Sequence, residues 1–246
     1  MGARIAIITG AGRGIGKSIA VTFARKGVFP VIVDLDKAAA DATVEELKAE
    51  GFKSAAFKVD VSNVAQVQAL VDDVYKQYGS VDILVNNAGI LSKTPLDELE
   101  EAEWDRVMNI NLKSAVFLMK YVTKYMKEKK WGRIVSISSL AGRMGGISTG
   151  CAYSTSKAAL IGLTMNIARK VASFGITVNA VAPGTAETEM AKGFTPDELA
   201  NLTKSIPVGK LIKPEGIAEA VCFLASDSAE FITGAVLDVN GGMFMG

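Results

Sequence analysis

A tyrosine and a lysine four residues apart could exchange protons with a substrate. Tyr153 and Lys157 fall in a helical pattern, so their side chains share one face. A tyrosine phenol titrates near ~10, too high for a base at neutral pH, but a neighbouring cation lowers that pKa. The chain contains no histidine, so proton chemistry must come from Tyr, Lys, Asp, Glu, Cys or water. The pair therefore predicts acid–base catalysis, although the same spacing also occurs in plain amphipathic contacts.

A glycine-rich stretch, residues 9–16, ends one apolar run and opens a helical pattern. Glycine lets a backbone turn tightly and approach a pyrophosphate closely, and the free N–H groups of a helix start attract phosphates. No Gly-Lys-Ser/Thr sequence closes the stretch at the spacing of an ATP-binding P-loop. We therefore expect a dinucleotide to bind here. The expected binding residues are Gly10, Gly12, Arg13, Gly14, Ile15 and Gly16.

An acidic residue, Asp34, ends the second apolar run, twenty residues after Gly14. A carboxylate there can accept hydrogen bonds from both hydroxyls of an adenosine ribose, and it would repel a 2′-phosphate. One unit-charge contact at ~4 Å is worth ~1 kcal/mol in water and ~4 kcal/mol at an effective dielectric constant of about 20. We therefore expect NAD as the cofactor. NADP is the alternative, because Arg13 could reach a 2′-phosphate.

Short apolar runs alternate with helical patterns along the whole chain. The runs are continuous, as in parallel strands that are covered on both faces. The expected strands are residues 5–8, 31–33, 55–59, 83–85, 133–137, 176–181 and 235–239. The expected helices are residues 14–26, 38–50, 64–78, 101–127, 153–173 and 214–225.

This order predicts an α/β protein with a doubly wound (Rossmann) parallel seven-stranded sheet and helices on both faces. No linker, composition shift or internal repeat divides the chain, so we expect a single domain over residues 1–246. Residues 185–210 are the least regular and follow a strand's carboxyl end, where such sheets bind ligands. They are expected to form a substrate lid, and an ordinary surface insertion with a short helix near 196–203 is the alternative.

The composition fits a protein that acts on small molecules. Of 246 residues, 49% are apolar, which suffices for a large core, and the net charge of +1 gives no sign of a nucleic-acid or membrane partner. Two cysteines exclude a disulfide framework and a Cys-rich zinc site, and no ligand cluster suggests a metal. No uncharged apolar run reaches the ~18 residues of a membrane span, so we expect a cytoplasmic protein.

Several motifs, in order along nearly the whole chain, resemble those of the short-chain dehydrogenase/reductase family, of the small single-domain type. The matching segments are residues 9–16, 86–89 (Asn-Asn-Ala-Gly), Asn111, Ser139, 153–157 (Tyr-Ser-Thr-Ser-Lys), 183–184 (Pro-Gly) and 240–243 (Asn-Gly-Gly-Met). The resemblance implies an NAD(P)-dependent oxidoreductase that acts on CH–OH groups. It makes Tyr153 the catalytic acid/base and Lys157 the cation that lowers its pKa and binds the nicotinamide ribose. Ser139 would orient the substrate oxygen, and Asn111 would hold a water chain to Lys157.

The resemblance also implies binding residues at the carboxyl ends of several strands. Asp60 is expected to contact adenine, and Thr188 the carboxamide of the nicotinamide. The other expected cofactor-binding residues are Leu35, Val61, Asn87, Ala88, Gly89, Pro183, Gly184 and Ala186, besides Asp34, Tyr153 and Lys157. The expected substrate pocket consists of Leu91, Ser139, Gly145, Gly146, Ile147 and Cys151.

The substrate is less defined than the reaction. Residues 175–184 and 240–243 look most like those of 3-oxoacyl-carrier-protein reductases. Those enzymes usually prefer NADP and lack an acid like Asp34, and Phe174 stands where they carry a cation to dock the acidic carrier. We therefore expect an NAD(H)-linked dehydrogenase of a secondary alcohol, or the reverse reduction of a ketone. The alternative is a 3-oxoacyl-carrier-protein reductase, and a non-catalytic cofactor-binding scaffold is a remote third. The resemblance implies a homotetramer.

Overall fold

The fold is built on one parallel sheet of seven strands. The computed structural model describes residues 3–146, 148–187 and 195–246. Its strand order is β3-β2-β1-β4-β5-β6-β7, and every neighbouring pair is parallel. The strands are β1 (Ile5–Thr9), β2 (Phe29–Asp34), β3 (Ala55–Lys58), β4 (Ile83–Asn86), β5 (Gly132–Ile137), β6 (Ile176–Pro183) and β7 (Val236–Val239). All seven predicted strands are present, and the predicted doubly wound sheet is confirmed.

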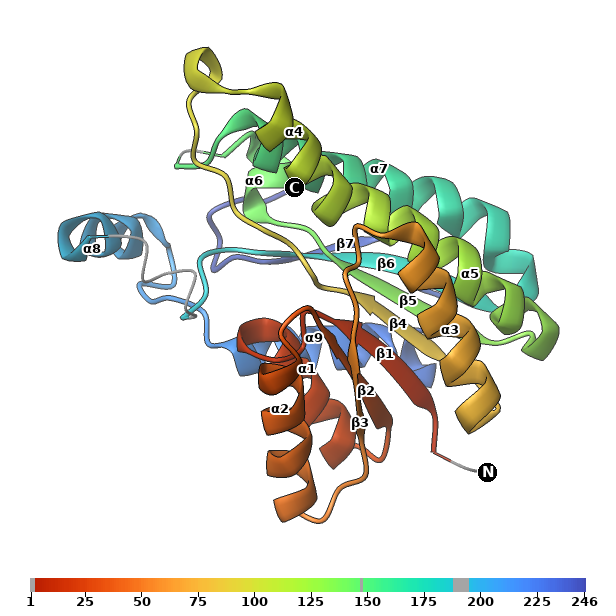
Figure 1. The fold of residues 1–246 in the computed structure, drawn as a ribbon. Helices are drawn as coiled ribbons and strands as arrows, with labels where there is room; N and C mark the ends of the chain where they lie inside the picture. Colours follow the sequence, from red (N-terminus) through yellow and green to blue (C-terminus); the bar gives the residue numbers. More distant parts are fainter. Residues whose placement is uncertain (1–2, 147, 188–194) are drawn as a thin grey trace.

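Helices cover both faces of this sheet (Figure 1). Helices α1, α2 and α9 lie on one face, and α3, α5 and α7 lie on the other. The α-helices are α1 (Gly14–Arg25), α2 (Lys37–Ala49), α3 (Val64–Tyr78), α4 (Glu101–Met108), α5 (Ser114–Lys129), α6 (Leu140–Met144), α7 (Cys151–Val171), α8 (Pro196–Ser205) and α9 (Pro214–Leu224). Short 3₁₀ turns are η1 (Leu96–Glu98), η3 (Ala172–Phe174) and η5 (Asp227–Ala229), and η2 (Asn109–Lys113) is a π-helical turn.

Two apolar layers hold the helices to the sheet. Successive residues of a strand point to opposite faces, so Ile7 and Ile8 of β1 enter different layers, and both are fully buried. Phe23 of α1 packs in the layer of Ile8, and Met126 of α5 packs in the layer of Ile7. This double burial explains why the strands read as continuous apolar runs. In the described residues, no helix is both long and apolar enough to cross a membrane.

The helix predicted over residues 101–127 is interrupted in the structure. Helix α4 ends at Met108, the π-helical turn η2 follows, and α5 begins at Ser114. A π turn holds one extra residue, and its apolar periodicity differs too little from that of an α-helix to be read from sequence. Helix α6 was also not predicted, because its five residues are too few to set up a period.

The topology places the ligand site before any side chain is considered. Strand β1 lies between β2 and β4, so the chain winds away from β1 in both directions. In such sheets, ligands bind outside the carboxyl ends of the strands at this reversal. The turn after β1 and the Asn-Asn-Ala-Gly segment after β4 meet there, which brings two of the predicted motifs together.

Candidate active site

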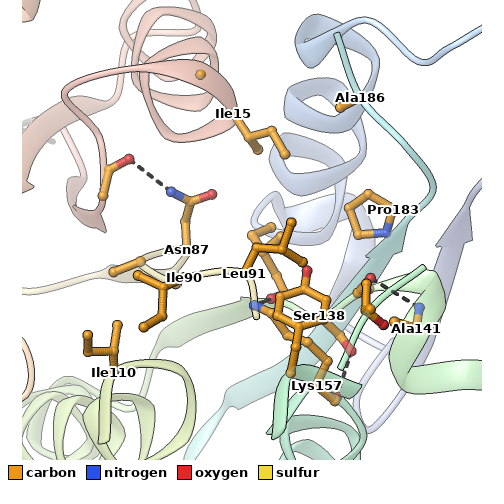
Figure 2. Close-up of a pocket in the computed structure, with 18 of the residues that line it drawn as sticks. Ile15, Asn87, Ile90, Leu91, Ile110, Ser138, Ala141, Lys157, Pro183 and Ala186 are labelled. Carbon is orange, nitrogen blue, oxygen red and sulfur yellow. Dashed lines mark hydrogen bonds between the residues drawn. The ribbon is translucent and has the colours of Figure 1, made fainter. Parts of the chain in front are cut away.

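A cavity of about 490 Å³ opens at the carboxyl ends of the strands. Its walls come from the glycine-rich turn, the segments that follow β2 to β6, and helix α7. Figure 2 shows Ile90 and Ile110 on one side, with Pro183 and Ala186 on the opposite side. Leu202 of α8 and Met243 add two further apolar side chains. One continuous cavity thus reaches from the expected adenine site to the expected catalytic group.

The glycine-rich turn has no room for larger side chains. A Cβ atom on Gly16 would lie 2.2 Å from the carbonyl oxygen of Gly10, and one on Gly12 would lie 2.8 Å from the Cβ of Ala39. Gly10 and Gly14 have φ angles of 62° and 55°, the left-handed region that favours glycine. No side chain caps the start of α1, so its first N–H groups are available to phosphate oxygens. The turn therefore fits a dinucleotide pyrophosphate.

Asn87 holds this turn from the neighbouring strand. Its side-chain amide donates hydrogen bonds to the carbonyl oxygens of Thr9 and Gly10, at 2.8 and 3.0 Å. Figure 2 shows the Asn87 amide with one of these bonds as a dashed line. In return, the Thr9 hydroxyl accepts the N–H groups of Asn87 and Ala88, both at 3.1 Å. Two segments far apart in sequence are thereby locked together beneath the cofactor site.

Asp34 lies at the adenosine end of the cavity. Its Oδ2 accepts the N–H of Gly12 at 2.9 Å, and its Oδ1 accepts the N–H of Asp36 at 3.1 Å. These bonds fix the carboxylate beside the glycine-rich turn, where the expected ribose hydroxyls would meet it. Leu35 lines the cavity and is 63% exposed, which leaves an apolar surface open to a flat ring.

Tyr153, Lys157 and Ser139 come together in the cavity. All three line it, and Tyr153 and Lys157 are buried. The Lys157 ammonium lies 5.8 Å from the centre of the Tyr153 ring and donates a hydrogen bond to the carbonyl oxygen of Ile137 at 2.8 Å. A hydrogen bond links Ser139 to Tyr153. The hydroxyl of Ser138 instead donates to the carbonyl oxygen of Lys157 at 2.8 Å, which leaves Ser139 as the hydroxyl beside the tyrosine.

Ser139 has a second, structural role. It is the N-cap of α6, and its Oγ accepts the N–H of Ala141 at 3.1 Å. This bond fixes the side chain at the point where β5 ends and α6 begins. The hydrogen bond that caps α6 therefore also orients the Ser139 hydroxyl toward Tyr153.

Asn111 lies in the π-helical turn and is buried. Its Oδ1 accepts the N–H of Ile90 at 2.8 Å, and its Nδ2 donates to the Ile90 carbonyl at 3.0 Å and to the Ser156 hydroxyl at 3.0 Å. The side chain thus ties the wall segment after β4 to helix α7. Its expected role in a water chain to Lys157 stays a prediction.

The pKa values differ from the sequence-based expectation. Burial raises the pKa of Tyr153 above its usual value, and the hydrogen bond with Ser139 lowers it by a smaller amount. Burial also lowers the pKa of Lys157 from 10.5 to about 8. The expected lowering of the Tyr153 pKa by Lys157 is therefore not seen in the protein alone. At neutral pH the tyrosine is a phenol, ready to give a proton, and the lysine is mostly an ammonium.

Most of the predicted binding residues line the cavity. Ser139, Leu91 and Gly146 of the predicted substrate pocket are among them. The predicted cofactor residues that line it are Gly10, Arg13, Gly14, Ile15, Asp34, Leu35, Asp60, Val61, Asn87, Ala88, Gly89, Tyr153, Lys157, Pro183, Gly184 and Ala186. Gly12 and Gly16 act from behind, as the tight packing of the turn shows. Thr188 and Ile147 lie outside the described residues.

Two predicted pocket residues do not line the cavity. Gly145 ends α6 with a φ of 87°, and a side chain there would meet nothing within 4 Å, so the position faces outward. Cys151 precedes Tyr153 by two residues in α7, which turns it about 200° away from the tyrosine's face of the helix. Their proximity in sequence to Tyr153 and α6 does not place them among the residues that line the cavity, so their role in a substrate pocket stays a prediction.

Sequence reasoning missed several residues of the site. The sequence analysis included Thr9 only as the start of the glycine-rich stretch. A hydroxyl at a strand end can accept backbone N–H groups of a neighbouring segment, as Thr9 does from Asn87 and Ala88. Met144, Leu202 and Met243 line the cavity as apolar side chains from three separate segments. No local pattern marks them, because the fold alone brings these segments together.

The chain matches a known family and several named proteins. The sequence model of the family described as "Enoyl-(Acyl carrier protein) reductase" matches residues 10–244. The chain is 43% identical to the 3-oxoacyl-[acyl-carrier-protein] reductase FabG of Staphylococcus epidermidis and 42% identical to that of Escherichia coli K12, each over 98% of both chains.

A solved structure agrees with these matches. The crystal structure of the 3-oxoacyl-[acyl-carrier protein] reductase from Brucella melitensis is similar with a TM-score of 0.94 and 35% identity, over 100% of this chain and 92% of that one. The predicted resemblance is thereby confirmed, and the chain is an NAD(P)-dependent oxidoreductase that acts on a ketone or alcohol. It belongs to the short-chain dehydrogenase/reductase family.

Proposed function

We propose that the protein reduces the 3-oxo group of an acyl thioester with NADH. The observation that carries this proposal is that one cavity is lined both by the Ser139–Tyr153 hydroxyl pair and by the apolar side chains of Met144, Leu202 and Met243. The hydroxyls suit a ketone oxygen, and the apolar side chains suit an alkyl chain. The names of the bacterial relatives support the same substrate class. They favour the alternative of our sequence analysis, a 3-oxoacyl reductase, over its first expectation, a dehydrogenase of a simple secondary alcohol.

The residues of the site suit proton transfer to a ketone. When bound, a nicotinamide cofactor supplies the hydride that adds to the carbonyl carbon. Ser139 and Tyr153 both donate to the carbonyl oxygen, and the Tyr153 proton moves to that oxygen as the hydride arrives. The Lys157 ammonium, 5.8 Å from the ring, stabilises the phenolate that remains. The raised pKa of Tyr153 keeps it protonated at neutral pH, as a proton donor for reduction must be.

Asp34 supports NADH rather than NADPH. Its carboxylate is held beside the glycine-rich turn by the N–H of Gly12 and keeps its charge close to the adenosine ribose. A 2′-phosphate would carry a second negative charge into the same place, at a cost of about 4 kcal/mol for a contact at ~4 Å and an effective dielectric constant of about 20. Arg13 also lines the cavity and would offset part of this cost for NADPH.

The proposal is tested by a panel of substrates with each cofactor. The panel contains a 3-oxobutanoyl thioester, a 2-butenoyl thioester and a simple ketone, and oxidation of NADH or NADPH is followed at 340 nm. We expect fast turnover of the 3-oxoacyl thioester with NADH. Turnover of the ketone alone would return the function to an NAD-linked alcohol dehydrogenase, and turnover of the butenoyl thioester alone would make the protein an enoyl reductase.

The cofactor preference has its own matched pair of variants. Asp34→Ala should narrow the ratio of kcat/KM for NADH over NADPH by at least tenfold, because it removes the charge that repels the 2′-phosphate. Asp41→Ala removes an exposed carboxylate of α2 that pairs with Lys37, and it should leave the ratio unchanged. An unaltered ratio in Asp34→Ala, or a wild-type preference for NADPH, would overturn the assignment of this residue.

A second candidate function is the NAD(H)-linked dehydrogenase of a secondary alcohol that the sequence analysis expected. Phe174 is 38% exposed and stands where, by the resemblance, 3-oxoacyl-carrier-protein reductases carry a docking cation, so this position itself offers no cation to an acidic carrier. This favours a free thioester or a simple secondary alcohol over a carrier-bound substrate.

The homotetramer, the cytoplasmic location and the lid over residues 185–210 stay predictions from the resemblance and the sequence. Light scattering that finds only monomers in solution would contradict the predicted homotetramer.

A further inference from the structure

The last seven residues of the sequence place one side chain, Met243, in the wall of the cavity. We call residues 240–246 the tail segment. Met243 lines the cavity, and the Asn240 side chain fixes the turn before it by accepting the N–H groups of Gly242 and Phe244, at 3.0 and 3.4 Å. The carbonyl oxygen of Gly241 accepts the N–H of Val208 at 3.1 Å. The tail segment therefore packs against the stretch that follows α8.

Arg143 connects this wall to helix α6. Its Nη2 lies 3.2 Å from Oδ2 of Asp238 in β7, two residues before the tail segment begins. Its guanidinium also stacks over the Phe244 ring, with the carbon Cζ 4.5 Å from the ring centre. The side chains of Arg143 and Asp238 are only 18% and 16% exposed. One side chain of α6 therefore contacts both β7, just before the tail segment, and Phe244 within the tail segment.

Helix α6 links these contacts to the catalytic group. Ser139 caps the helix at one end, Arg143 lies in its last turn, and Met144, beside Arg143, lines the cavity. Met243 in turn precedes Phe244, the ring on which Arg143 stacks. The position of Met243 relative to Ser139 thus depends on a five-residue helix and on the contacts of Arg143.

We propose that Arg143 is a positioning residue that sets the depth of the apolar part of the cavity, and thereby the acyl-chain length that the enzyme prefers. This inference rests on the proposed reduction of 3-oxoacyl thioesters. A four-carbon acyl group is held mainly at Ser139 and Tyr153. The extra methylenes of a longer chain need the wall formed by Met144 and Met243. Asn240 and Val208 hold the start of the tail segment, and Arg143 holds Phe244, the residue that follows Met243.

The size of the effect follows from the burial of methylene groups. An eight-carbon acyl chain has four more methylenes than a four-carbon chain. Each buried methylene strengthens binding about fourfold. If the released tail segment uncovers about half of the extra methylenes, the KM of the longer substrate rises by roughly 15-fold. The partly buried ion pair is strong enough for this role, because breaking such a pair leaves a desolvated charge behind.

The test measures KM and kcat for 3-oxobutanoyl and 3-oxooctanoyl thioesters with saturating NADH. The variants are Arg143→Ala, Asp238→Asn, Arg143→Lys and a control, Arg25→Ala, which breaks the exposed pair with Glu50 on the opposite face of the sheet. For Arg143→Ala and Asp238→Asn we expect KM to rise about 15-fold for the eight-carbon substrate only. We expect kcat and NADH affinity to stay within twofold. Arg143→Lys keeps a cation in reach of Asp238 and should restore most of the selectivity.

The outcomes separate the two proposals. If the wild-type enzyme reduces neither thioester, the proposed function fails, whatever the variants do. If it reduces both and the ratio of the two KM values is the same in Arg143→Ala and wild type, the inference about Arg143 is overturned. A ratio that also changes in Arg25→Ala would show a general loss of stability and would overturn it too. The NADH affinity shows that each variant is folded.

Discussion

The buried Lys157 should make the stability of the protein rise with pH in a range where most proteins lose stability. Burial lowers the pKa of its ammonium from 10.5 to about 8. This shift corresponds to about 3 kcal/mol by which the fold disfavours the charged form. Between these two pKa values the unfolded chain binds a proton that the folded chain does not, so the free energy of unfolding increases as pH rises.

The magnitude can be worked out for a practical pH range. From pH 7 to pH 9.5, this one group adds about 2 kcal/mol to the free energy of unfolding, with the steepest change above pH 8. The Lys157→Met variant lacks the titrating group and should lack this increase. The difference in free energy of unfolding between Lys157→Met and wild type at pH 7 alone is less informative, because the variant also loses the hydrogen bond from Nζ to the carbonyl oxygen of Ile137.

The assay is urea unfolding of the cofactor-free protein at several pH values, at one protein concentration because assembly adds to apparent stability. The quantity of interest is the difference between wild type and Lys157→Met at each pH, in which other titrating groups cancel. Lys124→Met, on the exposed face of α5, is the control and should run parallel to wild type. Parallel curves for wild type and Lys157→Met would refute the reasoning that burial without a compensating charge governs this lysine.

Two further predictions concern the catalytic hydroxyl and the glycine-rich turn. Tyr153→Phe should lower kcat by at least two orders of magnitude, since it removes the proton donor, while the Kd of NADH stays within twofold. Residual turnover above a tenth of wild type would contradict the assignment. Gly16→Ala should weaken NADH binding and lower the melting temperature, because its Cβ would lie 2.2 Å from the Gly10 carbonyl oxygen. A Cβ atom on Gly162 in α7 would have no neighbour within 4 Å, so Gly162→Ala should raise the free energy of unfolding by about 0.5–1 kcal/mol. If both variants changed NADH affinity and melting temperature equally, the tight packing at Gly16 would not be the cause.

The fold was predictable because its signals are local. Each apolar run became a strand, and the glycine-rich stretch at residues 9–16 lies between a strand and a helix as expected. That Tyr153 and Lys157, the proposed catalytic pair, reach the same cavity was predictable because they are one helical turn apart in α7. The π-helical turn at Asn109–Lys113 was not, since one extra residue in a long helix hardly changes the pattern of apolar positions.

The substrate end of the cavity was the least predictable part. Met243 and Leu202 enter it from segments whose local sequence carries no signal, and their meeting depends on the packing of the whole chain. The same holds for the pKa of Tyr153. Sequence spacing suggested a neighbouring cation that lowers it, but the enclosure of the ring by surrounding residues has the larger effect.

The brace between Asn87 and the glycine-rich turn has a consequence for how the protein is made. The bonds from Asn87 to the carbonyl oxygens of Thr9 and Gly10 span 78 and 77 residues of sequence. A nascent chain that has released only β1, α1 and β2 therefore carries the phosphate-binding sequence without the contact that shapes it. If the turn binds the cofactor as proposed, we expect affinity to arise only when β4 has docked beside β1, so that the cofactor stabilises the assembled sheet and not its early fragments.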